Sequence, residues 1–304
     1  MNAAAYLGIT WRRVPGRPSA SAHRPRAPGV PLSQHAAMTD EQPLIGSMDA
    51  RYAPVRVGDT VRRSSGSSRA AVRDLLLHLE SVGFDGAPRH LGIDDQGREV
   101  LSWIEGEVPV PPYPAWAMTD RALADLGGLI RRLHEATASF RGTAMDWSTQ
   151  WSDPGGGPVI CHNDLYPENV VFRDGRVVAL IDFAMAAPGR PLWDVAIAAE
   201  IWGPLGDPDR RDQHPIDLDG IARLGVLARG YGLERERAEE LVDVVIETRA
   251  QSIANIRAEI ADGNESWIGN WADAGGDDRA AADDAWIARQ RAALIQSAGG
   301  RIGS

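Results

Sequence analysis

Hydrophobic and polar positions follow different periods in the two parts of the chain. In the first part, short apolar stretches predict β-strands. One helix interrupts them, because Val72, Leu75, Leu76, Leu79 and Val82 recur at helical spacing and Gly83 ends the pattern. The predicted strands cover residues 44–46, 55–57, 60–63, 86–92 and 99–104.

The second part begins after a connector that contains Pro109, Pro111, Pro112 and Pro114. Prolines stiffen a connector, so we expect a boundary here between residues 38–108 and residues 109–304. Helical spacing then dominates, and residues 262–278 form an acidic loop between the last two helices. The predicted helices cover residues 120–137, 195–202, 218–229, 234–261 and 279–296.

A β-hairpin is predicted in the middle of this second part. Residues 170–172 form a short apolar run, Asp174-Gly175 is typical of a tight turn, and residues 177–181 form the returning run. Asp164 and Asn169 precede the hairpin and Asp182 follows it, so the fold brings three oxygen-bearing side chains to one rim. Such a set suits a hard cation, because Mg²⁺ takes oxygen ligands and often bridges protein and phosphate. The alternative is a capped turn and a buried acid in an unrelated α/β protein.

Two motifs flank the hairpin. His162-Asn163-Asp164-Leu165 with Asn169, followed by Asp182-Phe183, is similar to the H-x-D-L-x-x-x-N and D-F motifs of kinases. Ala184 stands where the kinase motif has glycine, and no A-P-E sequence follows. Together with the P-L-W-D-V-A sequence of residues 191–196, these motifs resemble the aminoglycoside phosphotransferase and choline kinase-like family.

The resemblance implies an α+β, bilobal, protein-kinase-like fold with a small antiparallel-sheet N-lobe and a larger, mainly helical C-lobe. It implies a phosphotransferase that moves the γ-phosphate of ATP to a hydroxyl of a small molecule, an aminoglycoside-like or amino-alcohol-like acceptor, with Mg²⁺ as a second cofactor. Asp164 would be catalytic and would accept or orient the proton of the hydroxyl. Asn169 and Asp182 would hold the metal, and His162 and Asp194 would support the catalytic loop.

The resemblance also implies a nucleotide site. The backbone of a hinge would meet the adenine, and a loop between the first strands would cover the phosphates. These positions are Ser102, Trp103 and Ile104 in the hinge and Gly46 and Ser47 in the loop. The chain has no lysine, because all 32 basic residues are arginine. Contact with phosphate would therefore fall to Arg62, with Arg63 as the alternative, through a bidentate guanidinium.

The chain departs from the family pattern at one position of the N-lobe. Kinase-like folds place a glutamate on the first helix to hold the phosphate-binding cation, and here Val72 occupies that position. This departure supports an alternative, a nucleotide-binding pseudokinase without transfer activity. The complete set of Asp164, Asn169 and Asp182 favours an active enzyme.

The formal net charge is −10, which disfavours DNA binding and is compatible with a cationic acceptor. Acidic residues surround Trp267 and Trp271 near the C-terminus, where a tryptophan could add a cation–π contact. The alternative is a solvated helix edge with both tryptophans in the core. The acidic residues are Glu259, Asp262, Glu265, Asp273, Asp277 and Asp278.

Residues 1–37 contain five arginines and no acidic residue, which predicts a disordered basic extension. It is a solvated tail, an arm that contacts RNA or anionic lipid, or sequence upstream of Met38 if that methionine and not Met1 is the initiator.

Cys161 is the only cysteine, so no internal disulfide forms. No apolar run has the length of a membrane span or signal peptide, so we expect a cytoplasmic protein. The sequence leaves the acceptor, the choice between ATP and GTP, and the oligomeric state open.

Overall fold

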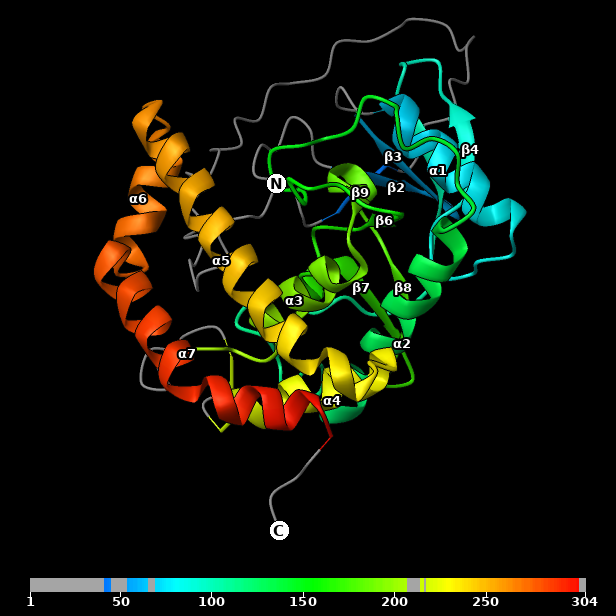
Figure 1. The fold of residues 1–304 in the computed structure, drawn as a ribbon. Coiled ribbons are helices and arrows are strands. Elements are labelled where there is room, and N and C mark those ends of the chain that lie inside the picture. Colours follow the sequence, from blue (N-terminus) through cyan, green and yellow to red (C-terminus); the bar gives the residue numbers. More distant parts are fainter. Residues whose placement is uncertain (1–40, 45–53, 65–68, 207–213, 216, 301–304) are drawn as a thin grey trace, which may run out of the picture.

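The protein was analysed as a computed structural model that describes residues 41–44, 54–64, 69–206, 214–215 and 217–300. A small antiparallel sheet with one helix is followed by a larger, mainly helical part, as the sequence predicts (Figure 1). The sheet and α1 lie at the upper right of Figure 1, and the last helices form the opposite side. The predicted α+β organisation is therefore confirmed.

The sheet has five strands in the order β1-β2-β3-β5-β4, and every neighbouring pair is antiparallel. The strand β1 lies just before the predicted residues 44–46, and β4 lies at the end of the predicted 86–92 stretch. The bounds are β1 Gln42–Pro43, β2 Val55–Val57, β3 Thr60–Arg63, β4 His90–Ile93 and β5 Glu99–Ser102.

The helix α1 (Arg69–Ser81) joins the sheet to the helical part. Val72, Leu75, Leu76 and Leu79 are all at most 2% exposed and belong to the same core cluster as the helices that follow. Burial of one such side chain contributes ~1.5–3 kcal/mol. Val82, predicted on the same face, lies beyond the helix and is 47% exposed.

The predicted hairpin consists of β7 (Val170–Arg173) and β8 (Arg176–Leu180). Its turn residues Asp174 and Gly175 have φ values of 52° and 70°, which the tight hairpin turn requires. A second antiparallel pair, β6 (Val159–Cys161) with β9 (Ala187–Gly189), brackets the hairpin. The loops at both ends of the hairpin therefore connect it to this second pair of strands.

The connector pairs with the hairpin on the other side. Glu107 exchanges two backbone hydrogen bonds with Phe172, at 2.7 and 2.8 Å. The backbone N–H of Leu180 donates to the carbonyl of Gly86 at 2.9 Å. A side chain at Gly86 would approach Leu129 Cδ1 to 2.5 Å, so this close approach needs glycine. The sheet part and the helical part therefore meet at the hairpin.

The helical part packs around the hairpin, with α5 crossing beside α3 (Figure 1). The side chain of Thr119 accepts from the backbone N–H of Ala122 and caps α2, a contact worth about 1 kcal/mol. The bounds are α2 Asp120–Thr137, α3 Pro191–Trp202, α4 Gly220–Tyr231, α5 Ala238–Ala261, α6 Glu265–Asp273 and α7 Gly276–Ala298, with one-turn 3₁₀ helices η3 Pro167–Asn169, η4 Phe183–Met185 and η6 Arg235–Arg237.

Two predictions for this part were wrong. The acidic segment 262–278 is not a loop, because α6 occupies its middle, where Trp267 and Trp271 supply a buried face. The helix α3 begins at Pro191, so Asp194 lies inside its first turn and does not precede it. Among the residues that the structure describes, none of the helices is long and apolar enough to cross a membrane.

Candidate active site

The loop between β6 and β7 is held by one buried carboxylate. Asp194 on α3 is 0% exposed and accepts hydrogen bonds from the backbone N–H groups of His162, at 2.7 Å, and Asn163, at 2.9 Å. Asn163 has a φ of 63°, a left-handed conformation that asparagine tolerates. Its carboxamide N–H donates to the carbonyl of Met185 at 2.9 Å. The loop conformation is therefore fixed from two sides.

His162 links the loop to the end of the hairpin. Its Nε2 lies 3.0 Å from the carbonyl of Ile181, so this nitrogen carries the proton. Burial lowers the pKa of the imidazole, which keeps the ring neutral. The free Nδ1 accepts from the backbone N–H of Asp164 at 3.3 Å. His162 thus contacts backbone on both sides, which suits the predicted supporting role.

A second buried histidine supports Asp194. His134 contacts Asp194 Oδ2 through Nε2 and the hydroxyl of Tyr231 through Nδ1, each at 3.1 Å. Among the residues that the structure describes, His134, Cys161 and Asp194 are the only cluster of metal-ligating types with all donor atoms within 4.8 Å. Burial raises the pKa of the Cys161 thiol, which stays protonated and donates to the carbonyl of Arg190 at 3.4 Å. The members of this cluster are thus hydrogen-bonded within the protein.

Asp164 lies at the bottom of the loop and is 5% exposed. Its Oδ1 has no hydrogen-bond partner within the part of the chain that the structure describes. Burial raises the pKa of this carboxyl to about 7, and the negative charges of Asp182 and Glu168 add to the shift. A buried acid with an unpartnered oxygen and a pKa near neutrality has the properties of a general base.

Asn169 and Asp182 lie beside this carboxyl. The carboxamide N–H of Asn169 donates to the backbone carbonyl of Asp164 at 2.9 Å, and the backbone carbonyl of Asn169 accepts from the backbone N–H of Ile181 at 2.9 Å. Asp182 follows with a φ of 61°, and its side chain is 47% exposed. The hairpin thus brings the three predicted residues to one rim, as the spacing of the motifs predicts.

This rim suits a divalent cation. It offers the carboxylate of Asp182 and the carboxamide oxygen of Asn169, both oxygen ligands of the kind that Mg²⁺ prefers. The left-handed backbone of Asp182 turns its side chain out of the hairpin, where it remains half-exposed. Asn169 and Asp182 are therefore the residues that would hold the metal.

Arg63, and not Arg62, reaches this rim from the sheet. Its Nη1 lies 2.8 Å from Asp182 Oδ1, and its Nε lies 3.1 Å from Glu99 Oε2. Alternation along β3 turns Arg62 to the other side, where it contacts the hydroxyl of Thr60 and lies 3.7 Å from Asp94. The sequence predicts Arg62 for phosphate contact with Arg63 as the alternative, and the geometry favours Arg63.

Glu99 was missed by the reasoning from sequence. It faces Arg63 across the β3–β5 pair and is 2% exposed. The position on α1 that holds the glutamate in kinase-like folds carries Val72, which is buried in the core. The signal that could have identified Glu99 is an acid directly opposite an arginine in two antiparallel strands.

The predicted hinge offers one free backbone donor. The N–H of Ser102 donates to the carbonyl of Arg89 and that of Trp103 to the carbonyl of Asp59, both at 2.9 Å. The N–H of Ile104 has no partner within the described part of the chain. The ring of Trp103 lies under the guanidinium of Arg56, 4.1 Å from its centroid. Gly46 and Ser47, predicted for the phosphate loop, lie outside the described residues.

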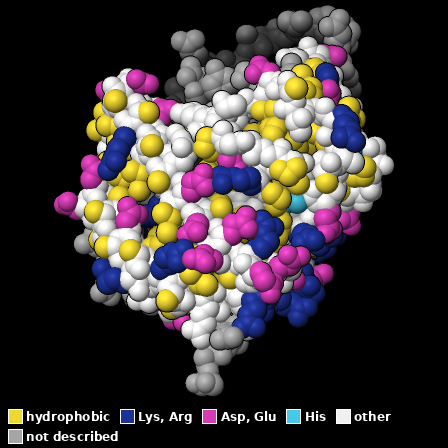
Figure 2. Space-filling view, in the orientation of Figure 1, with side chains coloured by type: hydrophobic (Ala, Val, Ile, Leu, Met, Phe, Trp, Pro, Cys, Tyr) yellow, Lys and Arg dark blue, Asp and Glu magenta, His cyan; other side chains and the backbone are white. Residues whose placement is uncertain are grey.

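The acidic cluster near the C-terminus does not surround an exposed aromatic face. Trp267 and Trp271 are 5% and 8% exposed, and Trp267 stacks on Trp151. Acidic and basic side chains are interspersed over the helical part of the face in Figure 2. Asp277, for example, pairs with Arg257 at 2.8 Å. The two tryptophans are thus core residues of a hydrophobic cluster that also includes Trp151.

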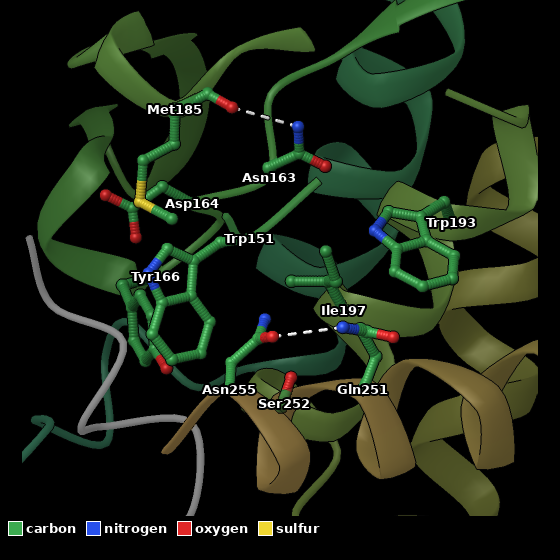
Figure 3. Close-up of a pocket in the computed structure, with 10 residues that line it drawn as sticks. All are labelled: Trp151, Asn163, Asp164, Tyr166, Met185, Trp193, Ile197, Gln251, Ser252 and Asn255. Atoms are coloured by element: carbon green, nitrogen blue, oxygen red, sulfur yellow. Dashed lines mark hydrogen bonds between the residues drawn. The ribbon is translucent and has the colours of Figure 1, made fainter. Parts of the chain in front are cut away.

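A pocket opens beside Asp164, between the catalytic loop and α5 (Figure 3). Its cavity volume is about 20 Å³, and the cavity continues into space that is open to solvent. The sequence motifs do not extend to its far wall, because those residues come from α5 and from the loop before β6. The lining residues are Trp151, Asn163, Asp164, Tyr166, Met185, Trp193, Ile197, Gln251, Ser252 and Asn255.

Comparison with known proteins gives consistent results. The model of a phosphotransferase enzyme family matches residues 144–241. A trifolitoxin immunity protein from Rhizobium leguminosarum bv. trifolii is 37% identical over 220 residues, which cover 69% of this chain and 80% of that protein.

Two solved structures share the fold. A choline/ethanolamine kinase family protein from Mesorhizobium loti superposes with a TM-score of 0.55 at 16% identity, covering 87% of this chain and 94% of that one. The aminoglycoside phosphotransferase APH(2″)-Ib with bound ADP gives a TM-score of 0.53 at 13% identity, covering 79% and 93%. The matched family, the immunity-protein relative and this kinase-like fold agree with the motifs around Asp164: the chain belongs to the phosphotransferase enzyme family that includes the aminoglycoside phosphotransferases.

Proposed function

We propose that the protein transfers the γ-phosphoryl group of ATP to a hydroxyl group of a small molecule. The observation that carries this proposal is Asp164, a buried carboxyl with an unpartnered oxygen and a pKa raised to about 7, at the base of an open pocket. A carboxyl with this pKa can hold a proton released by an alcohol at neutral pH.

In the proposed reaction, the acceptor hydroxyl lies in the pocket and donates to Asp164 Oδ1. Its O–H bond breaks and the proton passes to this carboxyl, while the hydroxyl oxygen bonds to the γ-phosphorus. The bond between the γ-phosphorus and the β–γ bridging oxygen breaks, and ADP leaves. Most of the rate gain comes from alignment of the hydroxyl with the phosphorus and from charge neutralisation.

Asn169 and Asp182 would hold Mg²⁺, which supplies positive charge to the phosphate oxygens when bound. Arg63 would contact a phosphate, and its guanidinium, held at 3.1 Å by Glu99, is already oriented toward the rim. The backbone N–H of Ile104 would donate a hydrogen bond to a ring nitrogen of the adenine. Glu99 supplies the acid that α1 lacks. Val72 at the usual glutamate position is therefore no longer an argument for a pseudokinase. We place the enzyme in the cytoplasm, where ATP is available.

The proposal is tested by ADP release with Mg²⁺-ATP and pooled alcohols, followed by mass spectrometry of the products. The Asp164→Asn variant should lose transfer by at least a hundredfold. Its affinity for a fluorescent ATP analogue should stay within about threefold of the parent, because Asp164 faces the acceptor. Unchanged transfer by this variant would remove Asp164 from its role.

A second candidate concerns the acceptor. The 37% identity to a trifolitoxin immunity protein over 80% of that protein supports a toxin as the molecule phosphorylated. If so, expression of the parent chain should protect a sensitive strain, and the Asp164→Asn variant should not. Protection by both chains would indicate that immunity does not depend on transfer.

A further inference from the structure

The pocket beside Asp164 is almost free of charge. Among the ten described residues that line it, only Asp164 carries a side chain that is charged near neutral pH. The α5 wall presents Gln251, Ser252 and Asn255, and Gln251 donates to Asn255 at 3.0 Å. Aromatic rings and a thioether complete the lining (Figure 3). Among these ten residues, Asp164 is therefore the single ionic partner that a charged acceptor would find.

Besides Asp164, the side chains of Trp193 and Asn163 each leave a buried polar atom of this pocket without a partner in the described part of the chain. The indole N–H of Trp193, a residue 2% exposed, has no hydrogen-bond acceptor, and Asn163 Oδ1 has no donor, in the described part of the chain. The oxygen of Asn163 is correctly assigned, since its nitrogen donates to the carbonyl of Met185 at 2.9 Å. Figure 3 shows both side chains on the same side of the pocket.

A buried donor and a buried acceptor without partners cost free energy unless a ligand satisfies them. The complementary group must accept from Trp193 and donate to Asn163. An amide does both, through its carbonyl and its N–H. An ammonium group can only donate, so the indole N–H would stay unsatisfied.

We propose that the acceptor is an uncharged alcohol that carries an amide group near its reactive hydroxyl. The amide would bind between Trp193 and Asn163, and the hydroxyl would reach Asp164. This inference rests on the proposed phosphotransferase function and narrows its substrate class. It replaces the cationic acceptor that the acidic composition suggests.

The test uses two pairs of acceptors. In each pair one member carries an ammonium group, and the other carries an uncharged acetamide in its place. Ethanolamine is compared with N-acetylethanolamine, and L-serinamide with N-acetyl-L-serinamide, under Mg²⁺-ATP, with the phosphorylated product measured by mass spectrometry. We expect kcat/KM to be at least tenfold higher for each acetylated member. Equal or lower values for the acetylated members would overturn the inference and leave the phosphotransferase function intact. No phosphorylated product from any member would overturn both.

A variant tests the proposed contact directly. Trp193→Phe removes the indole N–H and should reduce the preference for the acetylated member of each pair by about tenfold. The ratio of two acceptors on one preparation does not depend on the folded fraction, so partial unfolding cannot imitate this result. Trp286→Phe, at a half-buried position on α7 outside the pocket, is the matched control and should keep the preference. An unchanged preference in Trp193→Phe would exclude the indole as the recognition group.

Discussion

Arg63 on β3 donates to Glu99, its direct antiparallel partner on β5, and with its other end contacts Asp182 at the rim of the active site. Arg63, the cation that we propose for phosphate contact, is therefore held by a neighbouring strand and not by α1. A strand partner fixes the arginine by backbone register. The ion pair is 15% and 2% exposed, so solvent screens it little.

Removal of this partner should impair use of the nucleotide. In Glu99→Ala we expect kcat/KM for ATP to fall by ~10- to 100-fold, because Arg63 loses its anchor and no longer points toward the phosphates. Steady-state kinetics with ATP as the varied substrate measure this loss.

Arg62→Ala is the matched control for the same strand. Its guanidinium faces Thr60 and Asp94, away from the rim, so its kcat/KM for ATP should stay within about threefold of the parent. Equal losses in the two variants would contradict the assignment of Arg63.

The hairpin and α2 are predictable from the sequence because their signals are local. Asp174-Gly175 encodes the turn, and the short apolar runs on either side of it encode the strands. Since the motifs lie at the ends of these strands, the rim of Asp164, Asn169 and Asp182 follows from the same local signals. The prediction of α2 succeeds because an apolar stripe follows Thr119, its N-cap.

The remaining features depend on contacts between distant segments. Glu99 meets Arg63 only in one strand register, which single-sequence patterns do not specify. The pocket wall of α5 lies more than eighty residues after Asp164 in the sequence and carries no motif. The helix α6 was hidden because its acidic composition resembles a loop, whereas burial of Trp267 and Trp271 stabilises it.

The raised pKa of Asp164 predicts a pH dependence. Transfer requires the carboxylate form, and burial raises the pKa of this group to about 7. Below this value kcat/KM for the acceptor should fall about tenfold per pH unit. A pH–rate profile with Mg²⁺-ATP at saturation measures the midpoint, and a midpoint near 4 would refute the raised pKa.

The same pKa shift affects stability in a definite direction. The folded protein retains the proton of Asp164 up to about pH 7, whereas the usual carboxyl value is 3.8. Between these values the folded state binds more protons, so stability falls as pH rises. Asp164→Asn removes this pH-dependent loss of stability. At pH 8 the free energy of unfolding of the variant should exceed that of the parent by ~2–4 kcal/mol, and at pH 5 the difference should be smaller. Urea unfolding at both pH values measures the difference.

Asp194 should be essential for the shape of the catalytic loop. In Asp194→Asn one oxygen is replaced by an amide NH₂ that faces a backbone N–H, either that of His162 or that of Asn163. We expect a loss of ~2–4 kcal/mol in stability and at least a hundredfold in kcat. Glu240 is an exposed residue paired with Arg237, and Glu240→Gln is the control. We expect only a small change in its stability and in its kcat. Retained activity in Asp194→Asn would contradict its supporting role.

Removal of the metal should abolish transfer without unfolding the protein. The proposed ligands Asn169 and Asp182 lie on a hairpin whose strands and flanking bonds are formed by backbone, so the fold does not depend on the ion. Excess chelator should therefore stop ADP release while the circular dichroism spectrum stays constant. In Asp182→Asn the Mg²⁺ concentration for half-maximal rate should rise by at least tenfold, because a charged oxygen ligand is lost. Asp277→Asn, an exposed acid on α7 paired with Arg257, should leave this concentration unchanged. A magnesium requirement that is equal in all three proteins would remove Asp182 from the metal site.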